Sequence, residues 1–187
     1  MNLYLIRHGQ SVPNSEKRHS GWSMLPLTEK GLNDARRAGE ILKNIPFDRV
    51  YSSDLTRAVQ TARTALPGRE PEQLPLIRER SVGSLMERFF EDCAAEHGET
   101  YRQARASLDF TPFGGENADM VRTRAAEFLK LLESDPAENI AAFVHGGFMM
   151  HCIECVLGAQ FSVQSIVISN GAVIRLKHDV DHWRLEF

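Results

Sequence analysis

Short apolar runs alternate along the chain with longer segments in which apolar residues recur every three or four positions. Three of these runs have the length of buried strands: residues 2–6, 47–53 and 139–147. Three longer segments have helical spacing: residues 29–43, 55–66 and 117–134. Another helix is predicted after residue 147, and two closing strands, 163–169 and 171–178, are predicted on either side of Asn170. Strands that alternate with helices predict an α/β fold, a three-layer α/β/α sandwich with a mostly parallel central sheet.

Polar residues follow three of the predicted strands at the point where each strand ends. They are Arg7, His8 and Gly9 after the first strand, Ser52, Ser53 and Arg57 after the second, and His145, Gly146 and Gly147 after the third. Ligands of such sheets bind beyond the carboxyl ends of the strands, so these residues are expected to converge on one crevice. Arginine side chains match phosphate oxygens, and a helix N-terminus adds partial positive charge. The pattern therefore predicts a pocket for a phosphate dianion.

Composition and charge narrow the class of protein. The 187 residues, 42% of them hydrophobic, suit one domain that spans residues 1–187. A net charge of −3 argues against a nucleic-acid partner, and no apolar run approaches the roughly 20 residues that span a membrane. The three cysteines, at 93, 152 and 155, favour a reduced, cytoplasmic setting over a disulfide scaffold. The pair at 152 and 155 beside His151 is expected to be two packed thiols rather than a metal site.

Hydrolysis of a phosphate monoester needs charge stabilisation, a nucleophile and an acid. The sequence has neither an acidic metal-binding cluster nor a GxxxxGK[ST] loop, so no metal and no cofactor are expected. The positive charge would come from Arg7, Arg57 and His145. His8 could attack phosphorus and form a phosphohistidine, because neighbouring arginines favour its neutral form. A nearby carboxylic acid would then protonate the leaving oxygen.

Six segments resemble, in order, the motifs of one family. They are RHGQS followed by Asn14, HSGWSMLPLTEKG, SSDLTRAVQTA, RERSVG, FGGEN with Arg124 downstream, and FVHGG. A three-residue RHG pattern alone would be weak, whereas six ordered matches from residue 3 to about residue 176 are specific. The chain therefore resembles the histidine phosphatase superfamily, the phosphoglycerate mutase-like group, and the resemblance implies that group's α/β/α fold.

The resemblance implies a role for each matching residue. His8 would be the nucleophile, and Glu79 would protonate the leaving oxygen and then deprotonate the water that attacks phosphohistidine. It also implies residues at the phosphate or substrate: Arg7, Gly9, Asn14, Ser20, Gly21, Arg57, His145 and Gly146. The family's G-x-W-E-G stretch does not follow Gly83, so Glu87 competes with Glu79, although the spacing of ERSVG favours Glu79.

Several functions stay open within this resemblance. The short separation between Glu79 and His145 favours a metal-independent phosphomonoesterase that acts on a small-molecule phosphate ester. The alternatives are a cofactor-dependent phosphoglycerate mutase, a non-catalytic phospho-ligand binding module and a protein phosphatase. A monomer and a homodimer are both compatible with the sequence.

The segment from about residue 84 to residue 113 is expected to form a helical lid over the pocket, with a charged surface helix as the alternative. Four arginines would suit a substrate with a second negative group: Arg80, Arg88, Arg102 and Arg105. Arg124 lies among apolar residues at helical spacing and is expected to be structural, paired with Glu116 or another acid.

Overall fold

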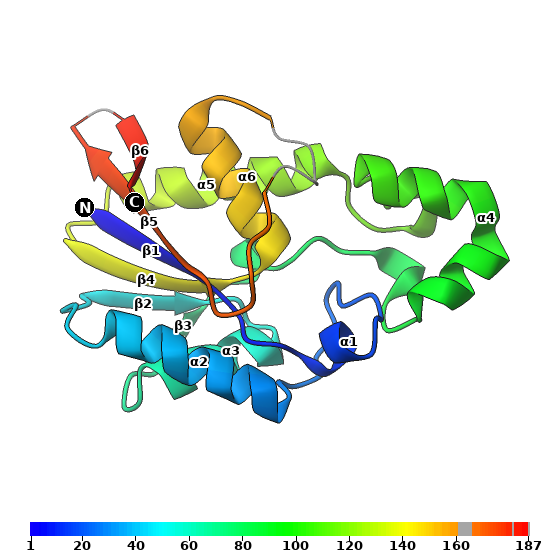
Figure 1. The fold of residues 1–187 in the computed structure, drawn as a ribbon. Helices are drawn as coiled ribbons and strands as arrows, with labels where there is room; N and C mark the ends of the chain where they lie inside the picture. Colours follow the sequence, from blue (N-terminus) through cyan, green and yellow to red (C-terminus); the bar gives the residue numbers. More distant parts are fainter. Residues whose placement is uncertain (161–165, 181, 187) are drawn as a thin grey trace.

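The central sheet of the computed structural model lies between two groups of helices (Figure 1). The structure describes residues 1–160, 166–180 and 182–186. Within these residues the sheet has six strands in the order β3-β2-β4-β1-β5-β6. The strands are β1 (Asn2–Arg7), β2 (Arg49–Ser52), β3 (Glu72–Gln73), β4 (Asn139–Val144), β5 (Val173–Asp179) and β6 (His182–Glu186).

The strands at the centre of the sheet are parallel and almost wholly apolar. β1 pairs with β4, β4 with β2, and β2 with β3, all in parallel, while β5 and β6 add an antiparallel pair at one edge. The register places Arg7 of β1 beside Val144 of β4. The next residues, His8 and His145, therefore leave the sheet side by side at its carboxyl edge.

Two helices cover each face of the sheet, which confirms the three-layer sandwich (Figure 1). α2 (Glu29–Leu42) and α3 (Thr56–Ala65) pack with Ile6 and Phe143 in one apolar cluster. α5 (Ala118–Glu133) and α6 (Gly146–Leu157) pack with Leu3 and Leu5 in a larger cluster on the other face. Alternate residues of one strand thus supply both cores, as the two-residue period of a strand requires.

Two of the predicted helices, α2 and α5, begin at a polar residue whose side chain caps the first turn. The Thr28 side chain accepts a hydrogen bond from the Gly31 amide at the start of α2, and the Asn117 side chain does the same for Met120 at the start of α5. These caps satisfy amides that a first turn leaves unpaired. None of the described helices is long and apolar enough to cross a membrane.

Another long helix, α4 (Phe90–Ser107), extends beside the short α1 (Val12–Ser15), beyond the carboxyl edge of the sheet (Figure 1). It is kinked at Gly98, whose φ of 51° belongs to a conformation that favours glycine. Short 3-10 turns precede and follow α4. The helix and these flanking segments share a small apolar cluster, separate from the two clusters at the sheet: Val82, Leu85, Cys93, Tyr101, Ala104 and Phe110. The segment expected to be a lid is therefore mostly helical.

The predicted strand at 163–169 is wrong over its described part, residues 166–169, and residues 163–165 lie outside the described chain. Residues 166–169 do not form a strand. Instead, the Ile168 carbonyl accepts a hydrogen bond from the Arg7 guanidinium. Val167 is exposed. Two strands went unpredicted: β3, which has only two residues, and β6, a polar edge strand.

Candidate active site

His8 and His145 meet at the carboxyl edge of the sheet, with ring centroids 5.1 Å apart. The His8 Nδ1 atom lies 2.6 Å from the Gly9 carbonyl oxygen. Because a carbonyl can only accept, we assign the proton to Nδ1, which leaves a lone pair on Nε2. The fold therefore presents His8 in the tautomer that a nucleophile at Nε2 requires.

Arg57, in the first turn of α3, is completely buried and fixed by three hydrogen bonds. Its Nε donates to His8 Nε2 at 3.2 Å, and its two terminal nitrogens donate to the carbonyls of Gly21 and Ser23, each at 2.9 Å. Burial lowers the pKa of Arg57 to about 10, against the opposing effect of the Glu79 charge. Arg57 is therefore still cationic at neutral pH.

Buried polar atoms beside His8 lack partners among the described residues. They are Arg7 Nε and both ring nitrogens of His145. A buried polar group without a partner is costly, and such groups in native proteins often mark a binding site. Arg7 Nε and the one protonated ring nitrogen of a neutral His145 can donate to the oxygens of a bound anion.

The two histidines are held neutral by their surroundings. Burial, followed by the charges of Arg57 and Arg7, lowers the pKa of His8 well below its usual value of 6.5. Burial and Arg57 lower the pKa of His145 in the same way. A neutral His8 retains the lone pair with which it could attack phosphorus.

Of the two candidate acids, Glu79 is the one at the cavity. The backbone amides of Gly147 and Arg80 donate to its two carboxylate oxygens at 3.1 and 2.9 Å. A Cβ on Gly147 would lie 2.4 Å from Glu79 Oε1, so a glycine is needed for this approach. Glu87 instead accepts from the Ser23 hydroxyl at 2.6 Å and does not line the cavity. The geometry therefore favours Glu79 as the acid.

A cavity of about 430 Å³ opens beside these groups. Its lining includes six of the expected site residues: Arg7, Asn14, Ser20, Gly21, Glu79 and Gly146. His8, Arg57 and His145 are almost fully buried and lie next to this lining. The Asn14 amide donates to the Ser20 hydroxyl at 3.3 Å, which holds both side chains at the cavity.

Gly9 is the expected site residue that the structure places away from the cavity. Its amide donates to the Thr61 hydroxyl at 3.1 Å. A Cβ on Gly9 would lie 2.1 Å from the Gly31 carbonyl oxygen at the start of α2. Gly9 thus allows the β1 loop and α2 to approach closely, which is a packing role.

The comparison with known proteins agrees with this geometry. The family model described as "Histidine phosphatase superfamily (branch 1)" matches residues 3–187. The chain belongs to the histidine phosphatase superfamily. This confirms the resemblance inferred from the six motifs.

The relatives of this chain include mutases and phosphatases. The 2,3-bisphosphoglycerate-dependent phosphoglycerate mutase 2 of Gloeobacter violaceus is 37% identical over 153 residues, which cover 77% of this chain and 70% of the mutase. The adenosylcobalamin/alpha-ribazole phosphatase of Salmonella typhimurium is 34% identical over 155 residues, 80% of this chain and 76% of that protein. The crystal structure of the alpha-ribazole phosphatase from Shigella flexneri matches with a TM-score of 0.88 at 26% identity and covers 100% of this chain and 95% of that one.

The structure adds residues that the sequence did not single out. The Trp22 indole donates to the Glu79 carbonyl at 2.7 Å, and the Asn170 amide donates to the His8 carbonyl at 3.0 Å. Trp22 lies within the quoted HSGWSMLPLTEKG segment, but Asn170 gave only a turn signal. Trp22 and Asn170 each donate a hydrogen bond to the backbone carbonyl of a site residue rather than to its side chain. No pattern of residue types therefore marked them.

The expected structural role of Arg124 is confirmed. Its guanidinium forms two hydrogen bonds with the Glu116 carboxylate, at 2.9 and 3.0 Å. It also donates to the carbonyls of Leu76 and Arg78, in the segment that leads to Glu79. Arg124 therefore fixes the loop that carries the candidate acid.

Of the four arginines considered for a second negative group, Arg80 alone lines the 430 Å³ cavity. Arg88 pairs with Glu96, and Arg102 pairs with Glu99. Arg105 stacks on the Phe90 ring, 4.6 Å from its centroid. Cys152 is buried in the larger apolar cluster, and the partly buried Cys155 packs against the same cluster.

Proposed function

We propose that this histidine phosphatase is a metal-independent phosphomonoesterase that hydrolyses a small phosphate ester through a phosphohistidine on His8. The observation that carries the proposal is the state of His8. Its Nδ1 proton is held by the Gly9 carbonyl, and its Nε2 accepts a hydrogen bond from the buried guanidinium of Arg57, with the partly buried Arg7 nearby.

In the first step, the phosphoryl group of the ester binds Arg7, Arg57 and His145. It replaces the Ile168 carbonyl as a partner of the Arg7 guanidinium. His8 Nε2 then forms a bond to phosphorus as the bond to the ester oxygen breaks. Glu79, in its acid form, gives its proton to that oxygen, and the alcohol leaves. The arginines stabilise the charge on the phosphoryl oxygens during transfer.

In the second step, water attacks the phosphohistidine. The Glu79 carboxylate takes a proton from the water as the new P–O bond forms and the P–N bond breaks. Inorganic phosphate leaves, His8 regains its lone pair and Glu79 is again an acid. Protons and bonds therefore balance over the two steps without an additional reactant.

The substrate is a small phosphate ester rather than a protein. Phe90, Leu108 and Phe110, from α4 and the turn after it, help to line the cavity, so the segment at 84–113 acts as its cover. The named relatives include an adenosylcobalamin/alpha-ribazole phosphatase, whose substrate class fits this proposal. We place the reaction in the cytoplasm, where three free cysteines stay reduced.

Phosphoglycerate mutase activity is the second candidate, because a named mutase is 37% identical to this chain. A mutase returns the phosphoryl group from histidine to a second substrate position, whereas a phosphatase passes it to water. The two therefore differ in the fate of the phosphohistidine and not in how it forms.

The test is hydrolysis of p-nitrophenyl phosphate in EDTA by the wild type, His8→Ala and His182→Ala. His182 is exposed on β6 and is the matched control. We expect EDTA-resistant release by the wild type and His182→Ala, and no release by His8→Ala. Equal release by all three would exclude His8 as the nucleophile. If the wild type releases nothing but 2,3-bisphosphoglycerate labels His8, the mutase assignment replaces this one.

A further inference from the structure

Asp34 is a buried carboxylate on α2 that the proposed reaction does not use. Its side chain is only 1% exposed, and its Oδ2 atom accepts a hydrogen bond from the Gln10 amide at 3.1 Å. Arg37 and Lys30 also lie within ion-pair distance of the carboxylate, but both of these side chains are largely exposed, where ion pairs contribute little. The Gln10 amide is the partner that links Asp34 to the loop after β1.

A single peptide group joins Asp34 to His8. The Gly9 carbonyl, whose oxygen lies 2.6 Å from His8 Nδ1, belongs to the same peptide as the Gln10 amide. The two ends of this peptide are coupled by the partial double bond between carbon and nitrogen. Hydrogen bonds in series polarise one another, so a carboxylate on the amide makes the carbonyl oxygen more negative. The Gly9 carbonyl is therefore a stronger acceptor for the His8 proton.

The backbone on both sides holds this peptide in one orientation. The Gly9 amide donates to the buried Thr61 hydroxyl at 3.1 Å. A Cβ on Gly31 would lie 2.0 Å from the Gln10 carbonyl oxygen, so the first turn of α2 contacts the loop directly. The peptide is thus fixed with its carbonyl toward the imidazole and its amide toward the carboxylate.

Attack on phosphorus places positive charge on the imidazole of His8. In the proposed first step Nε2 forms the bond to phosphorus while Nδ1 keeps its proton, so the ring becomes a phosphorylated imidazolium. The cations that bind the phosphoryl group, Arg57 and Arg7, oppose this charge. A stronger acceptor at Nδ1, away from the Arg57 contact at Nε2, stabilises the charged ring more than the neutral one.

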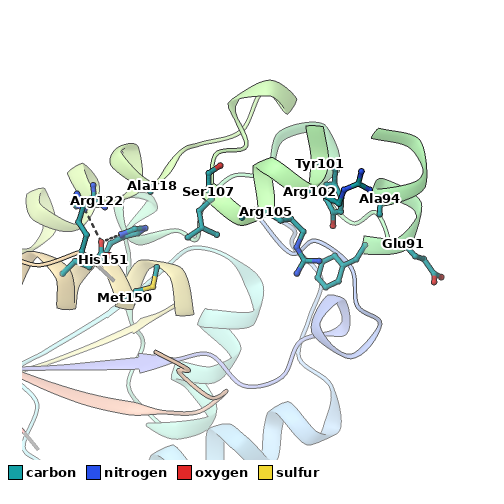
Figure 2. A pocket seen from close by; sticks show the side chains of 15 residues that line it. Glu91, Ala94, Tyr101, Arg102, Arg105, Ser107, Ala118, Arg122, Met150 and His151 are labelled. Carbon is teal, nitrogen blue, oxygen red and sulfur yellow. Dashed lines mark hydrogen bonds and ion pairs between the residues drawn. The ribbon is translucent and has the colours of Figure 1, made fainter. Parts of the chain in front are cut away.

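A second buried histidine shows what the interposed peptide changes. His151 Nδ1 lies 2.7 Å from a Glu154 oxygen, its Nε2 accepts from Arg80 at 2.7 Å, and Figure 2 shows it beside Arg122 in the wall of a cavity of about 1,040 Å³. Burial lowers the pKa of His151, and the direct Glu154 contact acts to raise it. At His8 the carboxylate is one peptide further away, so it strengthens the Nδ1 hydrogen bond and favours a proton at Nε2 less than direct contact would.

We propose that ionised Asp34, acting through the Gly9–Gln10 peptide, is a positioning residue that strengthens the Nδ1 hydrogen bond of His8 and so promotes the attack of Nε2 on phosphorus. The inference rests on the proposed function for the reaction that it assists. No proton moves along this path: Asp34 stays ionised, and the Nδ1 proton stays on His8 throughout. A purely structural Asp34 would only hold the loop against α2.

One substitution separates the charge of Asp34 from its hydrogen bond. Asp34→Asn has nearly the same shape and keeps a carbonyl oxygen that accepts from the Gln10 amide, so it removes the negative charge alone. Asp48→Asn is the matched control. Asp48 also accepts from two backbone amides, those of Glu138 and Asn139 at 2.9 and 3.0 Å, but at the opposite edge of the sheet. A structural role predicts little change in either variant.

Three measurements compare bond formation at His8 with simple anion binding. The kcat/KM for p-nitrophenyl phosphate, which includes the attack by His8, should fall about three- to twentyfold in Asp34→Asn. Vanadate, which forms a bond to a histidine nitrogen, should lose affinity by a similar factor. The Kd of inorganic phosphate should change less than about twofold, because phosphate binds without that bond, and its binding also shows that the variant is folded. Asp48→Asn should match the wild type in all three.

Nuclear magnetic resonance of protein labelled at the histidine ring nitrogens tests the hydrogen bond itself. The Nδ1 proton of His8 should move upfield in Asp34→Asn and stay in place in Asp48→Asn. This measurement and vanadate binding need no turnover, so they decide the inference even if hydrolysis through His8 fails. An unchanged His8 resonance, equal losses of vanadate and phosphate binding, or wild-type kcat/KM in Asp34→Asn would each overturn the inference.

Discussion

Arg57 shows how a single buried residue can be prepared for its ligand by backbone carbonyls. Two of its nitrogens bind the Gly21 and Ser23 carbonyls, and the third binds His8. The two carbonyls hold the guanidinium in place, so only its Nε hydrogen bond to His8 has to give way when an anion arrives and His8 attacks, which keeps the cost of reorganisation low. An ammonium group at the same place could not make three divergent hydrogen bonds in fixed directions.

Arg57→Lys should therefore lower kcat/KM for p-nitrophenyl phosphate by about 10²–10³-fold, the loss typical of one fixed charge-stabilising donor. It should also lower the free energy of unfolding, by about 1–3 kcal/mol for each carbonyl left without its donor. Arg63→Lys is the control, since Arg63 lies on the same helix but pairs with Glu70 at the surface. Steady-state kinetics and denaturant unfolding measure both effects. Similar kinetics for the two variants would contradict this role of Arg57.

Glu79 should matter most where the leaving oxygen needs a proton. Glu79→Gln should lower kcat/KM for glycerol 3-phosphate by about 10²–10⁴-fold, the usual contribution of a general acid. The loss with p-nitrophenyl phosphate should be smaller, because nitrophenolate leaves without protonation. Glu87→Gln is the matched control, and its kinetics with both esters should stay close to those of the wild type. A larger loss in Glu87→Gln would transfer the acid role to that residue.

At the scale of elements, the site forms because three strands end at one edge and one helix docks over it. The start of α4 lies against the loop after α1, where the Phe90 amide donates to the Lys17 carbonyl and the His19 amide to the Arg88 carbonyl. Inside the contact, His19 Nε2 and the Tyr101 hydroxyl are 2.7 Å apart. This buried hydrogen bond ties the second half of α4 to the loop that carries Ser20 and Gly21.

Tyr101→Phe should loosen this helix. The substitution removes the only polar atom of the Tyr101 side chain and leaves the buried His19 nitrogen unpaired, at a cost of about 1–3 kcal/mol. Hydrogen exchange of the α4 amides should become faster, and the free energy of unfolding should fall. Tyr51→Phe is the control, because the Tyr51 hydroxyl makes only a long 3.4 Å contact with Asp135. Exchange in α4 that is equally fast in both variants would argue against the docking role.

At the scale of the whole molecule, burial of histidines makes folding depend on pH. Burial lowers the pKa of four histidines below the ordinary value of 6.5: His8, His19, His145 and His151. For His19 the pKa falls to about 4, by burial and by the charge of Arg105. Below pH 6.5 the unfolded chain takes up protons at these residues while the folded chain does not. Folding stability is therefore retained above pH 6.5 and lost as the pH falls from there toward 4.

The melting temperature should accordingly be lower at pH 5 than at pH 7.5. Each such histidine contributes a slope of up to about 1.4 kcal/mol per pH unit in this window. His19→Gln should make the dependence shallower, whereas His182→Ala, at an exposed position, should leave it unchanged. Thermal unfolding in matched buffers at several pH values measures the slope. A melting temperature that is constant from pH 7.5 to pH 5 would contradict this account.

The sequence by itself determined the α/β class, the main helices and the side chains that gather at the carboxyl edge of the sheet. These follow from local information: the period of apolar residues, and polar residues placed directly after buried strands. The six ordered motifs carried the family for the same reason, since each is a short continuous segment.

Only the tertiary structure placed Glu79 rather than Glu87 at the cavity, fixed the tautomer of His8 and joined Arg80 to His151. It also placed residues 166–168, part of a predicted strand, in the lining of the cavity, where the Ile168 carbonyl accepts a hydrogen bond from Arg7. Each of these outcomes depends on contacts between segments far apart in the chain. Periodicity and spacing describe neighbours along one segment, so they hold no information about which distant donor will face a given acceptor.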